Sequence, residues 1–203
     1  VKLADALAET LGAAPAPMRG GQPGFALDYY VEAHIEQGPR LENARTTIGV
    51  VTGIQGSRRY IVEIDGEEAH AGTTPRAARK DAFAAATRIA AAMYEATTDA
   101  DDTLRFTIGR VEVQPGSPNT VPGKASFTID MRHPQDAVLK AHEKKLRDIV
   151  ADRAAPCAAR IERVTAVAPT DFDPRVIDLV RDRARALGLS HMDMPSGAGH
   201  DAM

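Results

Sequence analysis

Cysteine is almost absent from this chain, which has 203 residues and a single thiol at Cys157. An internal disulfide is therefore excluded, and a reducing compartment fits the composition. No apolar run approaches the ~20 residues of a membrane span, and no charged segment leads an apolar core at the start. Lys plus Arg total 25 against 28 Asp plus Glu, without a long run of either sign that would attract nucleic acid. We expect a cytoplasmic protein that binds neither membrane nor nucleic acid and takes a small molecule.

Nucleotide-binding motifs are also missing. The glycines near the end of the sequence are not followed by a Lys-Ser/Thr pair, and no strand is followed by a dinucleotide fingerprint. Hydrophobic residues make up 43% and charged residues 26%, as in a folded globular protein long enough for one large or two small domains.

The two ends of the sequence have their own patterns. Leu3, Leu7 and Leu11 recur at helical spacing, and the Gly- and Pro-rich stretch 12–24 predicts a loop. Apolar residues alternate with polar ones over 27–35, which predicts a strand with a polar face. Near the other end, Asp173-Pro174 predicts the start of a helix that ends at Gly188.

The middle block, 46–168, has its own order of predicted elements. We predict strands over 48–54 and 58–66, joined in a hairpin by Gln55-Gly56. A helix over 78–93, strands over 104–108 and 127–131, a helix over 138–150 and a last strand follow. This order predicts an α+β domain whose antiparallel sheet carries both helices on one face. Segments 1–45 and 169–203 are predicted to belong to one outer α/β domain into which the block is inserted.

Four side chains stand out as candidates for chemistry. His34 lies between Glu32 and Glu36 on the polar face of its predicted strand, and imidazole and carboxylate are ligands for zinc or manganese, although a solvated strand face has the same pattern. His70 lies in a loop before a helix, where it can donate to an oxyanion or simply cap that helix.

Asn119 and Arg132 follow in the middle block. Asn119 occupies a turn, where it can bind a substrate oxygen or serve the backbone. The guanidinium of Arg132 can bind a carboxylate with two hydrogen bonds or pair with a neighbouring acidic residue. The small residues around Gly199 and His200 suit close approach of a ligand to the backbone. From these residues alone, the sequence indicates an α+β protein and a possible metal-dependent hydrolase.

Five segments together resemble one family. They are His34–Pro39, Ala69–Pro75, Asn119–Gly123, Asp130–His133 and Ser196–Ala202. The family is the amidase, hydantoinase and carbamoylase branch of the M20 metallopeptidase superfamily, which includes N-carbamoyl-L-amino-acid hydrolase, allantoate amidohydrolase and beta-ureidopropionase. The resemblance implies that the middle block is a ferredoxin-like lid domain that forms a homodimer, and that the flanking segments are parts of a catalytic domain.

The resemblance also implies residue roles. His34 would be a ligand in a site for two divalent ions, zinc or manganese, and Arg132 would bind the substrate carboxylate. His70, as the catalytic oxyanion donor, and Asn119 would contact a ureido or carbamoyl substrate across the dimer.

Gln37, Gly199 and His200 would line the same substrate pocket. The other metal ligands and the glutamate base of the family are not found in this sequence. We therefore expect the 203-residue chain by itself to bind no metal pair and to be inactive. An M20 exopeptidase and a non-catalytic dimerisation module are the alternative interpretations.

Overall fold

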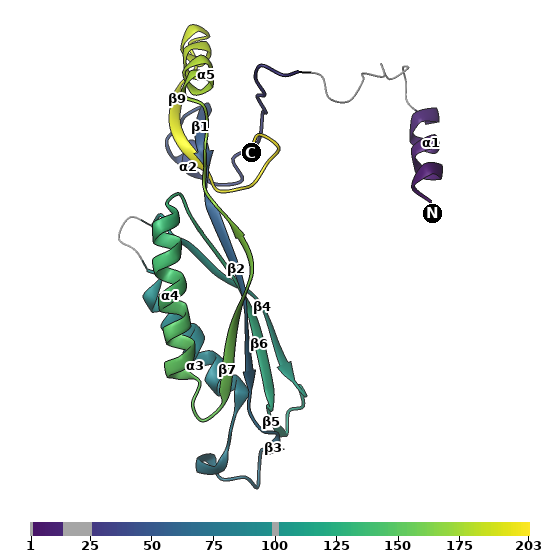
Figure 1. Ribbon diagram of the computed structural model, residues 1–203, viewed down its shortest axis with the longest axis vertical. Coiled ribbons are helices and arrows are strands. Elements are labelled where there is room, and N and C mark those ends of the chain that lie inside the picture. Colours follow the sequence, from purple (N-terminus) through teal and green to yellow (C-terminus); the bar gives the residue numbers. More distant parts are fainter. Residues whose placement is uncertain (1, 14–25, 99–101) are drawn as a thin grey trace. The chain divides into compact units, whose positions relative to one another are not determined.

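The computed structural model of the protein describes residues 2–13, 26–98 and 102–203 (Figure 1). The chain divides into two compact units, 1–32 and 33–203, which are described separately. Within the first unit, the helix predicted from the leucine spacing is present as α1 (Leu3–Ala13). Its leucines are exposed to solvent. Most of the predicted loop over 12–24 lies outside the described residues.

A four-stranded antiparallel sheet dominates the second unit. Its strands are β2 (Gly56–Asp65), β4 (Arg105–Gln114), β6 (Lys124–His133) and β7 (Ala158–Val167), in the order β4-β6-β2-β7. Helices α3 (Ala82–Ala96) and α4 (Asp136–Arg153) cover one face of this sheet, as Figure 1 shows. Chain order and strand order are those of a ferredoxin-like fold. The predicted antiparallel sheet with both helices on one face is therefore confirmed.

The core of this unit lies between the sheet and its two helices. Alternate residues of β2 and β6 point into it, including Val62 and Ile129, which are at most 1% exposed. Ile89 of α3 and Leu146 of α4 meet them and are fully buried. Each such side chain contributes about 1.5–3 kcal/mol when it leaves water. The period of two in the strands and of 3.6 in the helices thus produces a two-layer packing.

A charged network lies under α4, around the buried Arg58 and the largely buried Glu143. The guanidinium of Arg58 contacts the carboxylate of Asp136, and its Nε lies 3.8 Å from Glu143. Glu143 also accepts hydrogen bonds from Arg147, at 2.9 Å, and from Arg163 of β7, at 3.1 Å. Burial raises the pKa of Glu143, but these arginines outweigh burial and hold the pKa below its usual range. The network therefore links two strands of the sheet to α4.

The start of α3 differs from the prediction. The helix begins at Ala82, because the carboxylate of Asp81 accepts a hydrogen bond of 2.9 Å from Ala84 N and caps it. Upstream of this cap, the Thr74-Pro75 pair precedes a short 3-10 turn, Arg76–Ala78. The predicted start at residue 78 is wrong by one turn, because the Asp81 cap is the stronger signal.

The predicted hairpin at Gln55-Gly56 is wrong. Strand β1 (Ile48–Ile54) pairs with β9 (His191–Ser196) in parallel and with β8 (Thr170–Asp171) in antiparallel fashion. Neither turn residue adopts the positive φ that a two-residue hairpin turn requires. A Cβ at Gly56 would lie 2.7 Å from the Pro169 ring, so glycine is needed there for close packing. The chain instead runs from β1 into β2 without reversing.

The strand predicted over 27–35 is also wrong, because no residue from 26 to 39 forms one. A strand needs a neighbour for its backbone N–H and C=O groups, and no described strand pairs with this segment. By contrast, the last helix is confirmed as α5 (Pro174–Ala186), capped by the Asp173 side chain. Strand β9 was not predicted.

Two short elements complete the second unit. Helix α2 (Arg40–Asn43) follows the His34 segment, and a two-stranded ribbon is formed by β3 (Ala69–His70) and β5 (Thr120–Val121). In the described ranges, no helix is long and apolar enough to cross a membrane.

Candidate functional site

His34 and His200 lie together although they are far apart in the sequence. Their ring centroids are 5.7 Å apart, and the His200 ring also meets Phe172 edge-on at 6.2 Å. Nδ1 of His34 lies 2.7 Å from the carbonyl oxygen of Ile35. A carbonyl only accepts, so Nδ1 carries a proton, and in the neutral imidazole Nε2 then keeps its lone pair. This tautomer is the one that a histidine uses to bind a metal through Nε2.

The segment after His34 is held by a carboxylate. Glu36 accepts hydrogen bonds of 2.8 Å from the backbone N–H groups of Arg40 and Leu41, and so caps α2. Gln37 takes a left-handed conformation, with φ of 53°, and is exposed. Glu36 therefore has a structural role, and the predicted role of Gln37 in binding substrate stays a prediction.

The loop that carries Gly199 and His200 contacts the four-stranded sheet. Nη1 of Arg132, on β6, donates a hydrogen bond of 2.8 Å to the carbonyl oxygen of Gly197. Arg132 also donates from Nε and Nη2 to Asp130, at 2.7 and 3.1 Å. The ion pair considered as an alternative for Arg132 is therefore present. The contact with Gly197 brings the guanidinium to the loop of His200.

His70 lies at the opposite end of the long strands, on β3. Its Nδ1 accepts hydrogen bonds from the backbone N–H groups of Gly72, at 3.1 Å, and Thr73, at 3.2 Å. The ring proton must then be on Nε2, and His70 is exposed. This neutral imidazole presents an N–H donor to solvent, as an oxyanion donor requires.

Asn119 lies beside His70 in the same ribbon. The carbonyl oxygen of Asn119 accepts a hydrogen bond of 2.9 Å from Ala71 N, and His70 is paired with Thr120. The side-chain Oδ1 of Asn119 accepts from Ser117 Oγ at 2.7 Å, so its amide group is oriented with the N–H donors on the other side. The ribbon thus brings together two of the predicted substrate-binding residues.

The structure divides the predicted residues between two places. His34, Gln37, Gly199, His200 and Arg132 lie toward the end of the sheet where β2 begins, whereas His70 and Asn119 lie beyond the other end. Strand β2 has ten residues, which corresponds to ~33 Å at ~3.3 Å per residue. Within one chain, the two groups are therefore too far apart to act on one small molecule.

The described residues do not by themselves form a site for two metal ions. No group of three or more His, Cys, Asp or Glu side chains converges within 2–13, 26–98 and 102–203. A zinc site takes about four ligands, and His34 offers one imidazole. No step that requires a metal is therefore assigned to this chain.

Two residues around Arg132, Asp130 and Arg59, were not among the predicted site residues. Asp130 accepts from Arg132 and, at 2.9 Å, from Nε of Arg59 on the neighbouring strand. Partial burial raises the pKa of Asp130, but the two guanidiniums outweigh burial and lower the pKa. The period-two alternation places all three on the open face of the sheet. Only the pairing of Arg59 with Asp130, a long-range property, reveals the cluster.

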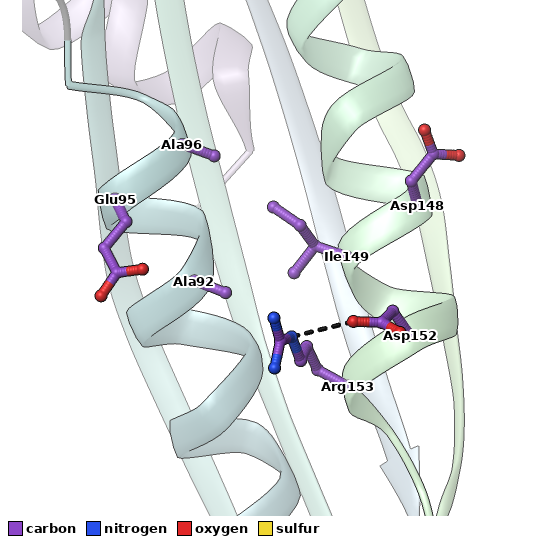
Figure 2. Close-up of a pocket in the computed structure, with 7 residues that line it drawn as sticks. All are labelled: Ala92, Glu95, Ala96, Asp148, Ile149, Asp152 and Arg153. Carbon is purple, nitrogen blue, oxygen red and sulfur yellow. Dashed lines mark ion pairs between the residues drawn. The ribbon is translucent and has the colours of Figure 1, made fainter.

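A groove lies between α3 and α4, away from all of these residues (Figure 2). Ala92, Ala96 and Ile149 line it together with Glu95, Asp148, Asp152 and Arg153. Figure 2 shows Arg153 paired with its neighbour Asp152, at 2.9 Å. The groove contains none of the predicted site residues.

Comparison with known proteins gives a consistent result. The peptidase dimerisation domain of the M20 family matches residues 52–156. An N-carbamoyl-L-amino-acid amidohydrolase of Paenarthrobacter aurescens is 38% identical over 179 residues, which cover 87% of this chain and 43% of that protein. An allantoate amidohydrolase of Bacillus subtilis is 38% identical over 181 residues, with the same coverage.

Solved structures agree with these relatives. A hydantoinase/carbamoylase family amidase from Burkholderia ambifaria has a TM-score of 0.81 and 41% identity over 89% of this chain and 45% of that chain. A second amidase of this kind, from Burkholderia multivorans, has a TM-score of 0.76 and 43% identity. This chain spans less than half the length of each of these proteins.

Proposed function

We propose, from the premise that this chain belongs to the M20 peptidase dimerisation domain family, that it supplies the lid and part of the active site of an amidohydrolase. The substrates would be N-carbamoyl-L-amino acids or ureido acids such as allantoate, because relatives at 38% identity carry those names. The four-stranded sheet with α3 and α4 would be the lid, inserted into a catalytic α/β domain to which β9 and α5 belong. Strand β1 was predicted as part of the middle block 46–168, but it pairs with β9 and would belong to the catalytic domain too.

The observation that carries the proposal is the hydrogen bonding of three polar side chains, which leaves each of them one group to offer to a ligand. Nε2 of His34 has a free lone pair for a metal ion, Nε2–H of His70 is a donor, and Arg132 is a cation beside the His200 loop. A ligand, an oxyanion donor and a carboxylate binder are what hydrolysis of a carbamoyl amino acid requires. The amide of Asn119 would join His70 in stabilising the tetrahedral oxyanion.

The separation of the two groups supports a shared site. His70 and Asn119 are about one strand length from Arg132, so they would serve the active site of the partner in a symmetric homodimer. We therefore expect the chain to sediment as a dimer. The rival M20 exopeptidase would use the same lid, but the relatives named above act on carbamoyl or ureido compounds.

The proposal is tested in a chimera. The matching segment of the Paenarthrobacter aurescens amidohydrolase is replaced by residues 26–203 of this chain, and hydrolysis of N-carbamoyl-L-amino acids is measured with Zn²⁺ or Mn²⁺. We expect an active chimera, loss of activity and of bound metal in His34→Ala, and no activity in the 203-residue chain alone. A folded, dimeric chimera that keeps full activity after His34→Ala would contradict the proposal.

A further inference from the structure

The guanidinium of Arg132 has two edges, and Asp130 occupies one of them. Nε and Nη2 form the side-on edge, and both donate to the Asp130 carboxylate, at 2.7 and 3.1 Å. Nη1 and the second hydrogen of Nη2 form the end-on edge. Nη1 points to Gly197 O, at 2.8 Å. A planar guanidinium held by two parallel hydrogen bonds has a fixed orientation, so the end-on edge faces the His200 loop.

Arg59 changes the net charge around the pair of Arg132 and Asp130. Arg132 and Asp130 alone would form a neutral pair, which attracts an anion poorly. Nε of Arg59 donates to Asp130 Oδ2 at 2.9 Å, and the two residues are direct cross-strand partners on β2 and β6. Two guanidiniums against one carboxylate leave the cluster with one net positive charge. Arg59 therefore restores the charge that Asp130 neutralises.

We infer that Asp130 and Arg59 are positioning residues for Arg132, which aim its end-on edge at the loop of Gly197 and keep the cluster cationic. The ligand class is a small carboxylate, which would replace the Gly197 carbonyl as acceptor at the end-on edge. This inference rests on the proposed function in so far as Arg132 binds the substrate carboxylate. The orientation of the guanidinium itself is independent of any substrate.

The orientation is measured on the full 203-residue chain by arginine side-chain NMR. The Arg132 signals are assigned by their loss in Arg132→Lys. We expect separate Nη1 and Nη2 signals in the unchanged chain, because the paired guanidinium rotates slowly, and a single averaged signal in Asp130→Ala. Asp130→Asn keeps the shape of the side chain and one acceptor, so we expect faster rotation than in the unchanged chain but slower than in Asp130→Ala.

A matched control removes another carboxylate from the same face of the sheet. Glu63 lies on β2 and pairs with Arg160 at 2.8 Å, so Glu63→Ala removes a cross-strand ion pair without touching Arg132. We expect its Arg132 signals to match those of the unchanged chain.

Binding is then measured by titrating carbamoylglycine, and separately its neutral amide, while the Arg132 signals are followed. We expect the anion to shift them and the amide to leave them unchanged. Arg59→Gln should weaken anion binding about two- to fivefold, and Arg59→Lys should restore it. Asp130→Ala should weaken it about two- to tenfold, the cost of ordering a freed arginine side chain.

The Asp130→Ala variant separates positioning from charge. Its cluster gains a net positive charge, so charge alone predicts tighter anion binding, whereas positioning predicts weaker binding. Tighter binding, or Arg132 signals as well separated as in the unchanged chain, would overturn the inference. An ordered Arg132 that responds to neither ligand would support the positioning of the guanidinium, but it would remove the carboxylate-binding role from the proposed function.

Discussion

Replacing Glu143 by alanine should destabilise the four-stranded sheet and its helices more than any change to an exposed ion pair of α4. The Glu143 side chain is 14% exposed and contacts Arg147 and Arg163, while Nε of the buried Arg58 lies 3.8 Å away. Removing one member of a buried ionic group leaves like charges close together and costs about 3–5 kcal/mol. Arg147 and Arg163 are 44% and 47% exposed, and Arg58 keeps Asp136. We therefore expect a cost of about 2 kcal/mol.

The assay is urea unfolding followed by circular dichroism, with a thermal scan alongside. A loss of 2 kcal/mol corresponds to a decrease in Tm of about 4–8 °C for a chain of this size. Asp148→Ala is the matched control, because Asp148 is an exposed residue of α4 that pairs with Lys144. It should change stability by less than about 0.5 kcal/mol. Equal costs for the two variants would refute the reasoning.

The pH dependence of stability provides an independent check on the role of Glu143. The folded pKa of Glu143 lies below its ordinary value of 4.5. Its contribution to stability is therefore fully present above that ordinary pKa and is lost as pH falls through the lowered folded value. The stability difference between the unchanged chain and Glu143→Gln should be constant near pH 7 and should narrow below about pH 4. A difference that grows on acidification would contradict the assigned sign.

Two further predictions concern the backbone. Gly56→Ala should lower the free energy of unfolding by about 1–3 kcal/mol, because the new Cβ would lie 2.7 and 2.9 Å from the ring and backbone nitrogen of Pro169. Gly109→Ala is the control. It has open space around the new Cβ, so it should lower the free energy of unfolding much less in the same urea titration. Asp81→Ala should lower the free energy of unfolding by about 1 kcal/mol, because it removes the cap of α3. Amide hydrogen exchange should then become faster in the first turn of α3. Unchanged exchange there would show that the cap is dispensable.

Local patterns predicted the elements whose causes are local. The leucine spacing of α1, the Asp173-Pro174 start of α5 and the alternation in β6 depend on neighbouring residues, and all three elements are present. The hairpin at Gln55-Gly56 failed for a different reason. The apolar run of β1 indicates a strand, but its partners β8 and β9 are more than a hundred residues away. Pairing at that distance leaves no signal in the turn.

The candidate site also has features that follow from local sequence and features that depend on long-range pairing. Residue types identified which side chains are candidates for chemistry, and the structure brings His34 to His200 and His70 to the strand beside Asn119. Asp130 and Arg59 were missed as a cluster, since their contact depends on the register of β2 against β6. The distance between the two groups of residues also follows from strand length and register, which the motifs do not contain.

The central claim is that one active site takes His34 from one chain and His70 from its partner. It is tested most directly by mixing two inactive variants of the chimera, His34→Ala and His70→Ala, and measuring hydrolysis after the subunits exchange. Random exchange makes half of the dimers mixed, with one of two sites intact, so activity should recover to about a quarter of the unmixed, unmutated level. Mixed dimers that form but show no recovered activity would contradict the claim.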